Sequence, residues 1–208
     1  MIKVVLFDVD GVLVDSFRAG HQFLIDVLKA MGYPAPTKEV FKTAFHLPLV
    51  PALKHLTKSE LTEELERLHE IVDRVHYHTE LLSEYPYTKE MLEILSHNYR
   101  LGIITSRNTD GLTKRYYPFA QTRSLFSVAI TRDDVTHYKP HPEPLLLAAK
   151  KLRVKPSECV YVGDSNTDIE AGKAAGMKTI MYGGRRNKDA DATTSSFKKL
   201  PSLIKALH

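Results

Sequence analysis

The feature that most constrains the fold is a short apolar run at residues 4–7, which ends directly in Asp8, Asp10 and Gly11. A run this short and rich in β-branched residues is typical of a strand buried in an α/β sheet. Such sheets carry their chemistry just beyond the carboxyl ends of the strands. Two carboxylates at that position, followed by a residue that lets the backbone turn, can supply a nucleophile, an acid or base and a metal ligand. The alternative is an ordinary turn with a helix cap, which favours the same residue types.

Apolar runs recur along the chain and alternate with segments of helical periodicity. The helical period is clearest at residues 145–152 and 168–175. Alternating strands and helices predict an α/β fold with a doubly wound parallel sheet. The expected strands are residues 3–7, 101–105, 127–130, 159–162 and 178–181.

A long interval without a convincing strand separates the first two of these strands. Residues 24–31 carry an apolar helical stripe that ends at Gly32. Thr57 and Glu60 then form a capping-box pattern, and the apolar period after it predicts a helix over residues 61–82. An interval of this size is too long for a single crossover connection. We therefore expect an all-helical domain inserted after the first strand.

The boundaries of this insertion follow from where the helical pattern starts and stops. We expect the inserted domain at residues 16–84 and the sheet-bearing core at residues 1–15 and 85–208. An inserted domain beside the catalytic edge of a sheet is well placed to act as a lid.

The composition predicts a globular protein of the cytoplasm. Of the 208 residues, 43% are hydrophobic and 26% are charged. No apolar stretch approaches the ~20 residues that a membrane-spanning helix needs. The first residues lead straight into the first strand, so we expect no signal peptide. Cys159 is the only cysteine, which predicts a packed thiol and a reducing compartment.

The charge pattern bears on the partners of the protein. A net charge of +4 favours anionic ligands without specifying them. The basic pairs at residues 185–186 and 198–199 are short and are not accompanied by a nucleic-acid motif. We expect neither a nucleic acid nor a membrane as a partner.

Two further segments carry residues suited to phosphate binding. Thr105 ends the second expected strand, where a hydroxyl beside backbone N–H groups that lead into a helix can bind phosphate oxygens. Lys139 lies in a proline-rich stretch, residues 138–144, that would hold it in one place. A lysine so placed can neutralise a phosphoryl group during its transfer. A common strand-to-helix turn and a surface lysine are the alternatives.

A second pair of acids follows a later apolar run. Asp164 and Asp168 come after residues 159–162, and the spacing between them passes through a helix start. Mg²⁺ prefers oxygen ligands, usually one or two carboxylates with waters and a substrate phosphate. Asp8 and Asp164 together meet that requirement. Asp168 is compatible with a supporting role in the metal site and with a simple interaction with the helix dipole.

Taken in order, these segments resemble the haloacid dehalogenase superfamily over almost the whole chain. The inserted helices are similar in place and length to the cap domain of many members. The resemblance implies a Rossmann-like core, and the cap size and the segment around Lys139 are similar to the phosphoglycolate phosphatase and pyrophosphatase-like group. The matches to the four motifs are residues 8–12, Thr105, Lys139, and Gly163 with Asp164 and Asp168.

The resemblance also implies a mechanism. Asp8 would attack phosphorus and form an aspartyl-phosphate, and Asp10 would protonate the leaving oxygen and then activate the hydrolytic water. Asp8, Asp164 and the backbone carbonyl of Asp10 would bind Mg²⁺, with Asp168 supporting that shell. Members that displace halide carry another residue at the position of Asp10, so the chain resembles the phosphate-transferring branch.

The same resemblance assigns the phosphate site and leaves the substrate open. Thr105, the backbone of Ser106 and Lys139 would hold the phosphoryl oxygens. The second motif of the superfamily often has Asn or Lys where this chain has Ser106 and Arg107. Arg107 is compatible with a contact to substrate and with a position in solvent. The expected protein is a phosphatase of the phosphoric monoester hydrolase class that hydrolyses a small phosphorylated metabolite. A phosphoglycolate-like substrate or pyrophosphate is the expected compound.

Two functions of other classes are compatible with parts of the pattern. Related β-phosphoglucomutases share the first motif but carry a histidine at the position of Gly20. His21 lies one residue further, about 100° around a helix, and is a poor substitute. A catalytically inactive binding module would be expected to lose one of the acids or Lys139, and all are present.

The inserted segment is rich in histidine, and imidazole is a common zinc ligand. The spacing does not form a tight ligand motif, and two of the side chains, two residues apart, would point differently on a helix. We expect these histidines to be exposed or to face the substrate, and the protein to be a monomer or a homodimer. The residues concerned are His46, His55, His69, His76 and His78.

Overall fold

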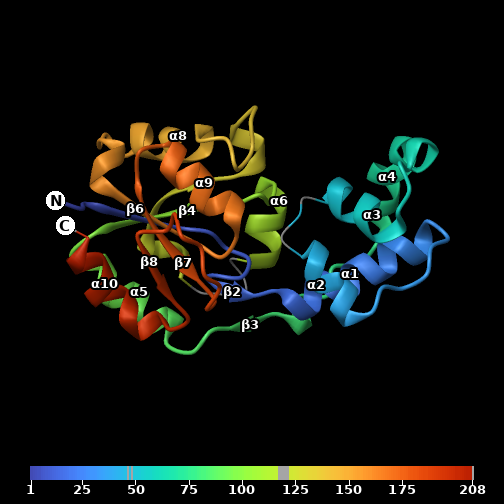
Figure 1. The fold of residues 1–208 in the computed structure, drawn as a ribbon, viewed down its shortest axis with the longest axis horizontal. Helices are drawn as coiled ribbons and strands as arrows, with labels where there is room; N and C mark the ends of the chain where they lie inside the picture. Colours follow the sequence, from blue (N-terminus) through green and yellow to red (C-terminus); the bar gives the residue numbers. More distant parts are fainter. Residues whose placement is uncertain (46, 48, 117–121, 208) are drawn as a thin grey trace. The chain divides into compact units, whose positions relative to one another are not determined.

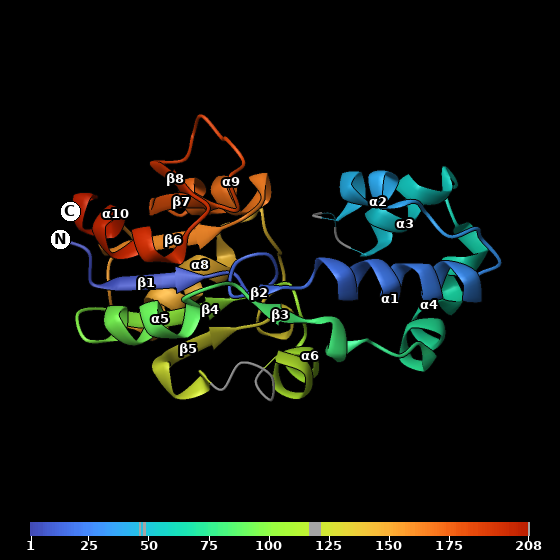
Figure 2. The same cartoon turned by 90° about the horizontal axis from the view of Figure 1, so that it is seen from below.

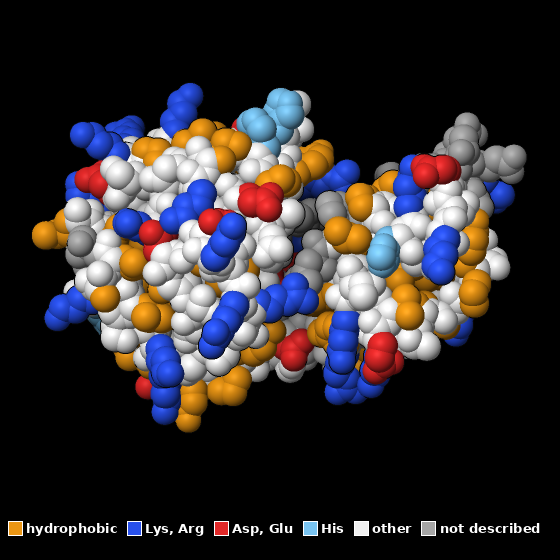
Figure 3. Space-filling model, viewed as in Figure 1, with side chains coloured by type: hydrophobic (Ala, Val, Ile, Leu, Met, Phe, Trp, Pro, Cys, Tyr) orange, Lys and Arg blue, Asp and Glu red, His pale blue; other side chains and the backbone are white. Residues whose placement is uncertain are grey.

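The chain folds into two compact units, Met1–Asp15 with Ser83–His208 and, between them in the sequence, Ser16–Leu82. None of the described helices is long and apolar enough to cross a membrane. On the face drawn in Figure 3, Lys and Arg side chains are spread over both units with Asp and Glu among them. The computed structural model describes residues 1–45, 47, 49–116 and 122–207, and of these the backbone alone at residues 62–66, 69 and 115.

The larger unit is built on a six-stranded parallel sheet in the order β5-β4-β1-β6-β7-β8. Val5 in β1 pairs with Leu101 of β4 on one side and with Val160 of β6 on the other. The chain moves outward from β1 to β5 and then returns to the other side of β1, which confirms the doubly wound sheet. Ligands of such sheets bind outside the carboxyl ends of the strands where this reversal occurs. The strands are β1 Val4–Phe7, β4 Arg100–Ile104, β5 Phe126–Ile130, β6 Cys159–Gly163, β7 Lys178–Tyr182 and β8 Ala192–Thr194.

The edge strand β8 is not among the strands expected from the sequence. It has three residues and contains no apolar run, so no periodic signal marks it. Asp191, directly before β8, is held against β7 because its Oδ2 accepts hydrogen bonds from Thr179 N at 2.8 Å and Lys173 Nζ at 2.6 Å. These tertiary contacts place the strand.

Helices cover both faces of this sheet (Figure 1). On one face, Leu145 and Ala148 of α8 and Ala171 of α9 join Tyr161 of β6 in one apolar cluster. Helices α5 and α10 pack together on the opposite face. Cys159 is buried, as expected for a packed thiol. The helices of this unit are α5 Thr88–Ser96, α6 Thr109–Gly111, α8 Glu143–Lys151, α9 Asn166–Ala174 and α10 Leu200–Ala206.

The smaller unit contains helices packed around their own apolar cluster. Val27 and Leu28 of α1 meet Phe41 of α2 and Leu53 of α3 in this cluster, together with Leu68 of α4. Phenyl rings of this unit make edge-to-face contacts in the core, and the centroids of Phe17 and Phe41 lie 5.1 Å apart. The helices are α1 Phe17–Ala30, α2 Lys38–Ala44, α3 Leu49–Thr57 and α4 Thr62–Arg74, followed by the short turn Thr79–Leu81.

The helix expected over residues 61–82 is too long at its carboxyl end, and Thr57 does not begin it. Thr57 is the last residue of α3, and its hydroxyl donates to Leu53 O at 2.9 Å. Helix α4 ends at Arg74, because Val75 adopts an extended conformation with φ −80° and ψ 127°. β-Branched and aromatic residues have low helix propensity, and the segment after Arg74 is rich in them.

The boundary expected at residue 85 also differs from the one observed. A short strand, β3 Ser83–Glu84, pairs antiparallel with β2 Val14–Asp15, which follows the loop after β1 (Figure 2). The backbone pairing of β3 with β2 places residues 83–84 in the sheet-bearing unit. The chain therefore leaves that unit and re-enters it at one point.

Candidate active site

A tight loop after β1 carries the first two acids. Asp8 continues the strand direction, and its backbone N donates to Val162 O of β6 at 2.9 Å. The chain then turns back on itself, with the N–H of Val14 donating to Val9 O at 3.0 Å. Gly11 lies in this turn with φ +81°, and a Cβ there would lie 2.0 Å from Asp164 Oδ2. The glycine is therefore required for the acids from β1 and β6 to approach each other.

Three carboxylates meet at the carboxyl ends of β1 and β6. Ligand oxygens of Asp8, Asp164 and Asp168 lie within 4.8 Å of one another, and all three residues are buried. Burial raises the pKa of Asp8 well above its ordinary value, and the negative charges of Asp168, Asp164 and Asp10 raise it further. Lys139 acts in the opposite direction without cancelling the shift.

Lys139 lies among these acids with its side chain only 6% exposed. Its Nζ lies 2.6 Å from Asp168 Oδ1 and 3.1 Å from Asp8 Oδ1, and it donates to the Tyr161 hydroxyl at 3.0 Å. Burial by itself would lower the pKa of Lys139, but the charges of Asp168 and Asp8 outweigh burial and raise it. The lysine is therefore a fixed positive charge beside Asp8.

Asp168 is fully buried, and both of its oxygens accept hydrogen bonds. Oδ1 accepts from Tyr161 Oη at 2.9 Å in addition to Lys139, and Oδ2 accepts from Ser165 N at 3.0 Å and Ser165 Oγ at 2.5 Å. Burial opposes ionisation, yet Lys139 and the other donors lower the pKa of Asp168 below its ordinary value. A Cβ at Gly163 would lie 2.2 Å from Asp168 Cβ, so this close packing requires glycine. Asp168 therefore holds Lys139 in position, and Tyr161 is a member of the site that the sequence did not single out.

Asp10 is engaged by Arg107, whose position the sequence left open. Arg107 Nε donates to Asp10 Oδ2 at 2.7 Å, and Nη2 donates to Oδ1 at 2.6 Å. The two bonds form a bidentate pair, the strongest arrangement of a guanidinium with a carboxylate. Arg107 is thus directed into the site and not into solvent.

The end of β4 brings Thr105 and Ser106 to the same edge of the sheet. Thr105 is buried, and its Oγ1 accepts a hydrogen bond from Arg107 N at 3.1 Å. Asn108 caps the following turn, since its Oδ1 accepts from Gly111 N at 2.8 Å. The side chain of Ser106 is exposed, which leaves its backbone as the part suited to an anion.

The donor set fits a hard divalent cation. Asp8 and Asp164 offer buried carboxylate oxygens, the ligands that Mg²⁺ prefers. Burial, and after it the charges of the neighbouring acids, raises the pKa of Asp8, and a bound cation would favour its ionised form. The oxygens of Asp168 already accept hydrogen bonds from Lys139, Tyr161 and Ser165, so Asp168 is suited to support and not to direct ligation.

The histidines of the smaller unit fall into different surroundings. His21 Nε2 lies 3.4 Å from Pro36 O, and His55 Nε2 lies 2.7 Å from the Thr43 hydroxyl. His76 and His78 follow α4 on a non-helical segment, and the centroids of their rings lie 4.9 Å apart. The expectation that they diverge on a helix is therefore wrong. His46 and the side chain of His69 lie outside the described residues.

The sequence was also compared with known proteins and protein families. A family model of haloacid dehalogenase-like hydrolases matches residues 5–182 of the chain. The pyrophosphatase PpaX of Bacillus cereus is 33% identical over 184 residues, which cover 86% of this chain and 82% of that protein.

Two solved structures share the whole architecture. A candidate phosphoglycolate phosphatase from Lactobacillus plantarum superposes with a TM-score of 0.84 at 27% identity and covers 98% of this chain and 99% of its own. A candidate β-phosphoglucomutase from Thermotoga maritima superposes with a TM-score of 0.70 at 27% identity, over 100% of both chains. The similarity therefore extends over both units of the chain.

Proposed function

Because the chain belongs to the haloacid dehalogenase-like hydrolase family, we propose that it is a Mg²⁺-dependent phosphatase that forms an aspartyl-phosphate. The observation that carries this proposal is the buried group of Asp8, Asp164 and Lys139 at one sheet edge. This group offers a nucleophile, oxygen ligands for a hard cation and a fixed positive charge. The inserted helical unit would serve as the cap that selects the substrate.

In the first step, a carboxylate oxygen of Asp8 attacks phosphorus, and the bond from phosphorus to the leaving oxygen breaks. That oxygen takes a proton from Asp10. Lys139, 3.1 Å from Asp8 Oδ1, offsets the negative charge that the phosphoryl group brings. Thr105 and the backbone of Ser106 would orient the phosphoryl oxygens. Mg²⁺ bound by Asp8, Asp164 and the Asp10 carbonyl would supply the remaining positive charge.

In the second step, Asp10 takes a proton from a water molecule, and the water oxygen attacks phosphorus. The bond between phosphorus and the Asp8 oxygen breaks, which releases inorganic phosphate and restores the carboxylate. The bidentate ion pair with Arg107 holds the Asp10 carboxylate in a fixed position for its role as a base. Protonation of Asp10 for the first step requires that this ion pair loosen.

The ion pair between Arg107 and Asp10 also suggests which substrates the site prefers. Protonation of Asp10 weakens its ion pair with Arg107, and a guanidinium binds carboxylate and phosphate groups bidentately. A second anionic group on the substrate could then accept hydrogen bonds from Arg107. Pyrophosphate and phosphoglycolate-like esters have such a group, and these are the compounds after which two relatives are named.

The test is phosphate release from a panel of compounds, with Mg²⁺ or with EDTA. The panel contains pyrophosphate, phosphoglycolate, sugar phosphates and nucleotides. We expect release that depends on Mg²⁺, stops with EDTA, and is fastest for compounds with a second anionic group beside the phosphoryl group. Absence of release from every compound with Mg²⁺ would overturn the proposal and favour an inactive binding module.

A phosphosugar mutase is the second candidate, since one structural neighbour carries that name. The position of the mutase histidine is occupied by Gly20, and the ring of His21 packs against Phe41 at 4.8 Å between centroids. This arrangement favours the phosphatase. Conversion of glucose 1-phosphate to glucose 6-phosphate with little phosphate release would reverse that order.

A further inference from the structure

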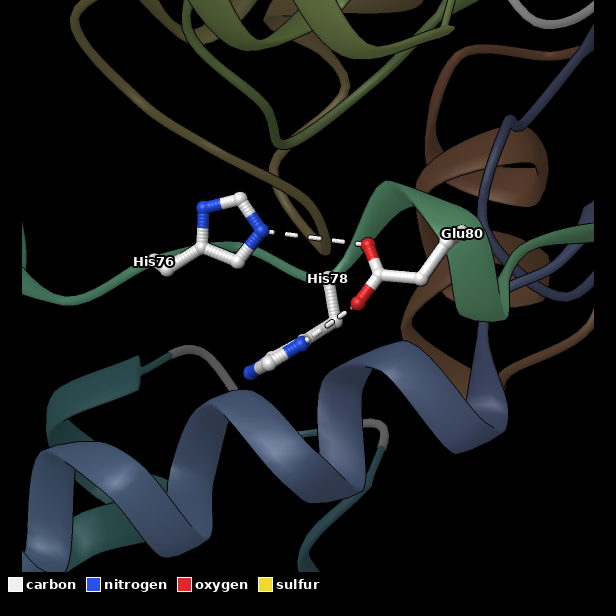
Figure 4. A group of neighbouring side chains, drawn as sticks. All are labelled: His76, His78 and Glu80. Atoms are coloured by element: carbon white, nitrogen blue, oxygen red, sulfur yellow. Dashed lines mark hydrogen bonds and ion pairs between the residues drawn. The ribbon is translucent and has the colours of Figure 1, made fainter.

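A group of side chains in the smaller unit has the composition of a transition-metal site. His76, His78 and Glu80 lie on the segment that follows α4, and Figure 4 shows the Glu80 carboxylate directed toward both imidazoles. His78 Nδ1 lies 2.7 Å from Glu80 Oε1, and His76 Nε2 lies 3.8 Å from Glu80 Oε2. The two imidazole centroids are 4.9 Å apart. Two nitrogens and a carboxylate therefore converge within five residues of chain.

A second carboxylate orients one of these imidazoles from behind. Asp26 of α1 lies 3.0 Å from His78 Nε2 through its Oδ2, and its Oδ1 accepts a hydrogen bond from Gln22 Nε2 at 3.0 Å. Histidines that bind metals almost always donate their other ring N–H to a carboxylate, carbonyl or water, which fixes the tautomer and the ring orientation. Without metal, both ring nitrogens of His78 donate to carboxylates, Nε2 to Asp26 and Nδ1 to Glu80. A metal ion would replace the proton on Nδ1, while Nε2–H would keep its bond to Asp26.

We propose that His76 Nε2, His78 Nδ1 and the Glu80 carboxylate bind a divalent transition metal, for which Zn²⁺ is the best fit, with Asp26 as the carboxylate behind His78. Imidazole nitrogen suits Zn²⁺, Cu²⁺ and Ni²⁺ better than Mg²⁺ or Ca²⁺. Bonds of about 2.0–2.1 Å in a tetrahedron place neighbouring ligand atoms about 3.3 Å apart. His78 Nδ1 lies 2.7 Å from Glu80 Oε1 and His76 Nε2 lies 3.8 Å from Glu80 Oε2, and one ligand atom from each residue lies within 4.8 Å of the others. Small side-chain rotations would bring the three ligand atoms to the tetrahedral spacing. A water molecule would complete the coordination.

The exposed side chains of the proposed ligands are free to rotate into a tetrahedral arrangement. The side chains of His76 and Glu80 are 71% and 59% exposed, so small rotations are not resisted by packing. His78 is more buried and is held on α1 by Asp26, which makes it the fixed member of the set. Bound metal would thereby connect the segment after α4 to α1 and stabilise the smaller unit.

A second histidine group in the larger unit provides a matched control. His137, His141 and Glu143 have the same composition, and the centroids of the two imidazoles are 4.6 Å apart. The Glu143 carboxylate already accepts from the backbone N of Thr136 and of His137, each at 3.0 Å, and His141 Nδ1 accepts from Glu143 N at 3.2 Å. Its ligand atoms are engaged in the local backbone, so we expect no comparable metal site there.

The experiment is a titration of the metal-stripped full chain with Zn²⁺ by calorimetry, and with Co²⁺ by visible absorption, in excess Mg²⁺ that occupies the carboxylate site. We expect one equivalent of Zn²⁺ to bind to the parent and to the control His137→Ala/His141→Ala. We expect His76→Ala/His78→Ala to lose this binding, together with the Co²⁺ bands of a four-coordinate site.

Asp26→Asn serves as a second variant that keeps all three ligands. Loss of a carboxylate behind a ligating histidine weakens metal affinity about 10–100-fold, and we expect a loss in that range. Circular dichroism without metal checks that each variant is folded. The proposal is overturned if the His76→Ala/His78→Ala variant binds Zn²⁺ as the parent does. It is equally overturned if the control variant loses as much binding.

Discussion

The buried carboxylate of Asp168 allows a sharp prediction about stability, through the substitution Asp168→Asn. The two oxygens of Asp168 accept from Lys139, Tyr161 and Ser165. Asparagine keeps one oxygen and replaces the other with an NH₂ group, which is itself a donor. If NH₂ takes the place of Oδ2, it faces the Ser165 backbone N–H, which cannot rotate away. If it takes the place of Oδ1, it faces the Lys139 ammonium.

Either orientation leaves a buried lysine with one charged partner fewer. Removal of one member of a buried ion pair costs about 3–5 kcal/mol. For a chain of this size, that corresponds to a decrease in Tm of roughly 6–20 °C. Tyr161→Phe is the matched control, because it removes hydrogen bonds to the same two side chains without removing charge, at a cost of about 1 kcal/mol for each bond.

The pH dependence gives a second readout. The pKa of Asp168 in the folded protein is below its ordinary value of 3.8. The stability that its charge contributes is therefore fully present above about pH 3.8 and is lost as the pH falls through the folded pKa. Thermal unfolding followed by circular dichroism in EDTA should show a wide gap between parent and Asp168→Asn at neutral pH, and a narrower gap near pH 3. A gap below about 1 kcal/mol at neutral pH, or one that does not change with pH, would refute the reasoning.

Other substitutions at this sheet edge have separate expected outcomes. Asp8→Asn should lower turnover by more than about a thousandfold. It should also raise Tm at neutral pH without metal, because a folded pKa above the ordinary value means that ionised Asp8 costs stability as the pH rises; a lower Tm would contradict this sign. Arg107→Lys should raise KM for pyrophosphate about tenfold, because one charge-assisted hydrogen bond is lost. KM for a substrate with a single anionic group should change less, and an equal change for both substrates would count against the proposed contact. Gly11→Ala should abolish Mg²⁺-dependent activity because its Cβ would lie 2.0 Å from Asp164 Oδ2, whereas Gly32→Ala, at a similar φ of +82° with nothing within 4 Å, should keep the activity.

The sheet and the grouping of acids could be predicted because both depend on local patterns. Strands buried on both faces are continuous apolar runs, and parallel strands end at the same edge. Asp8 and Asp164 follow such runs directly, so their proximity needs only the topology. Lys139 was expected in one fixed place, and the structure gives it two carboxylate partners.

The parts that could not be predicted depend on contacts distant in the sequence. The pair of Arg107 with Asp10 joins residues 97 positions apart, and no local pattern marks it. Tyr161 sits in an apolar run, so its hydroxyl is hidden by the hydrophobic periodicity of β6. The convergence of His76 and His78 depends on where α4 ends, and helix ends are the least certain part of any prediction from sequence.

The pairing of β2 with β3 has a consequence for how proteins of this design can change. Val14 lies opposite Glu84, so the backbone enters and leaves the inserted unit through two adjacent residues. The insertion is therefore attached to the sheet-bearing unit in the same way as a hairpin loop, whatever its length. Loop closure costs little more for a long insertion than for a short one. The helical unit can thus be exchanged as a module, and evolution or design can replace it while Asp8, Asp164 and Lys139 keep their scaffold.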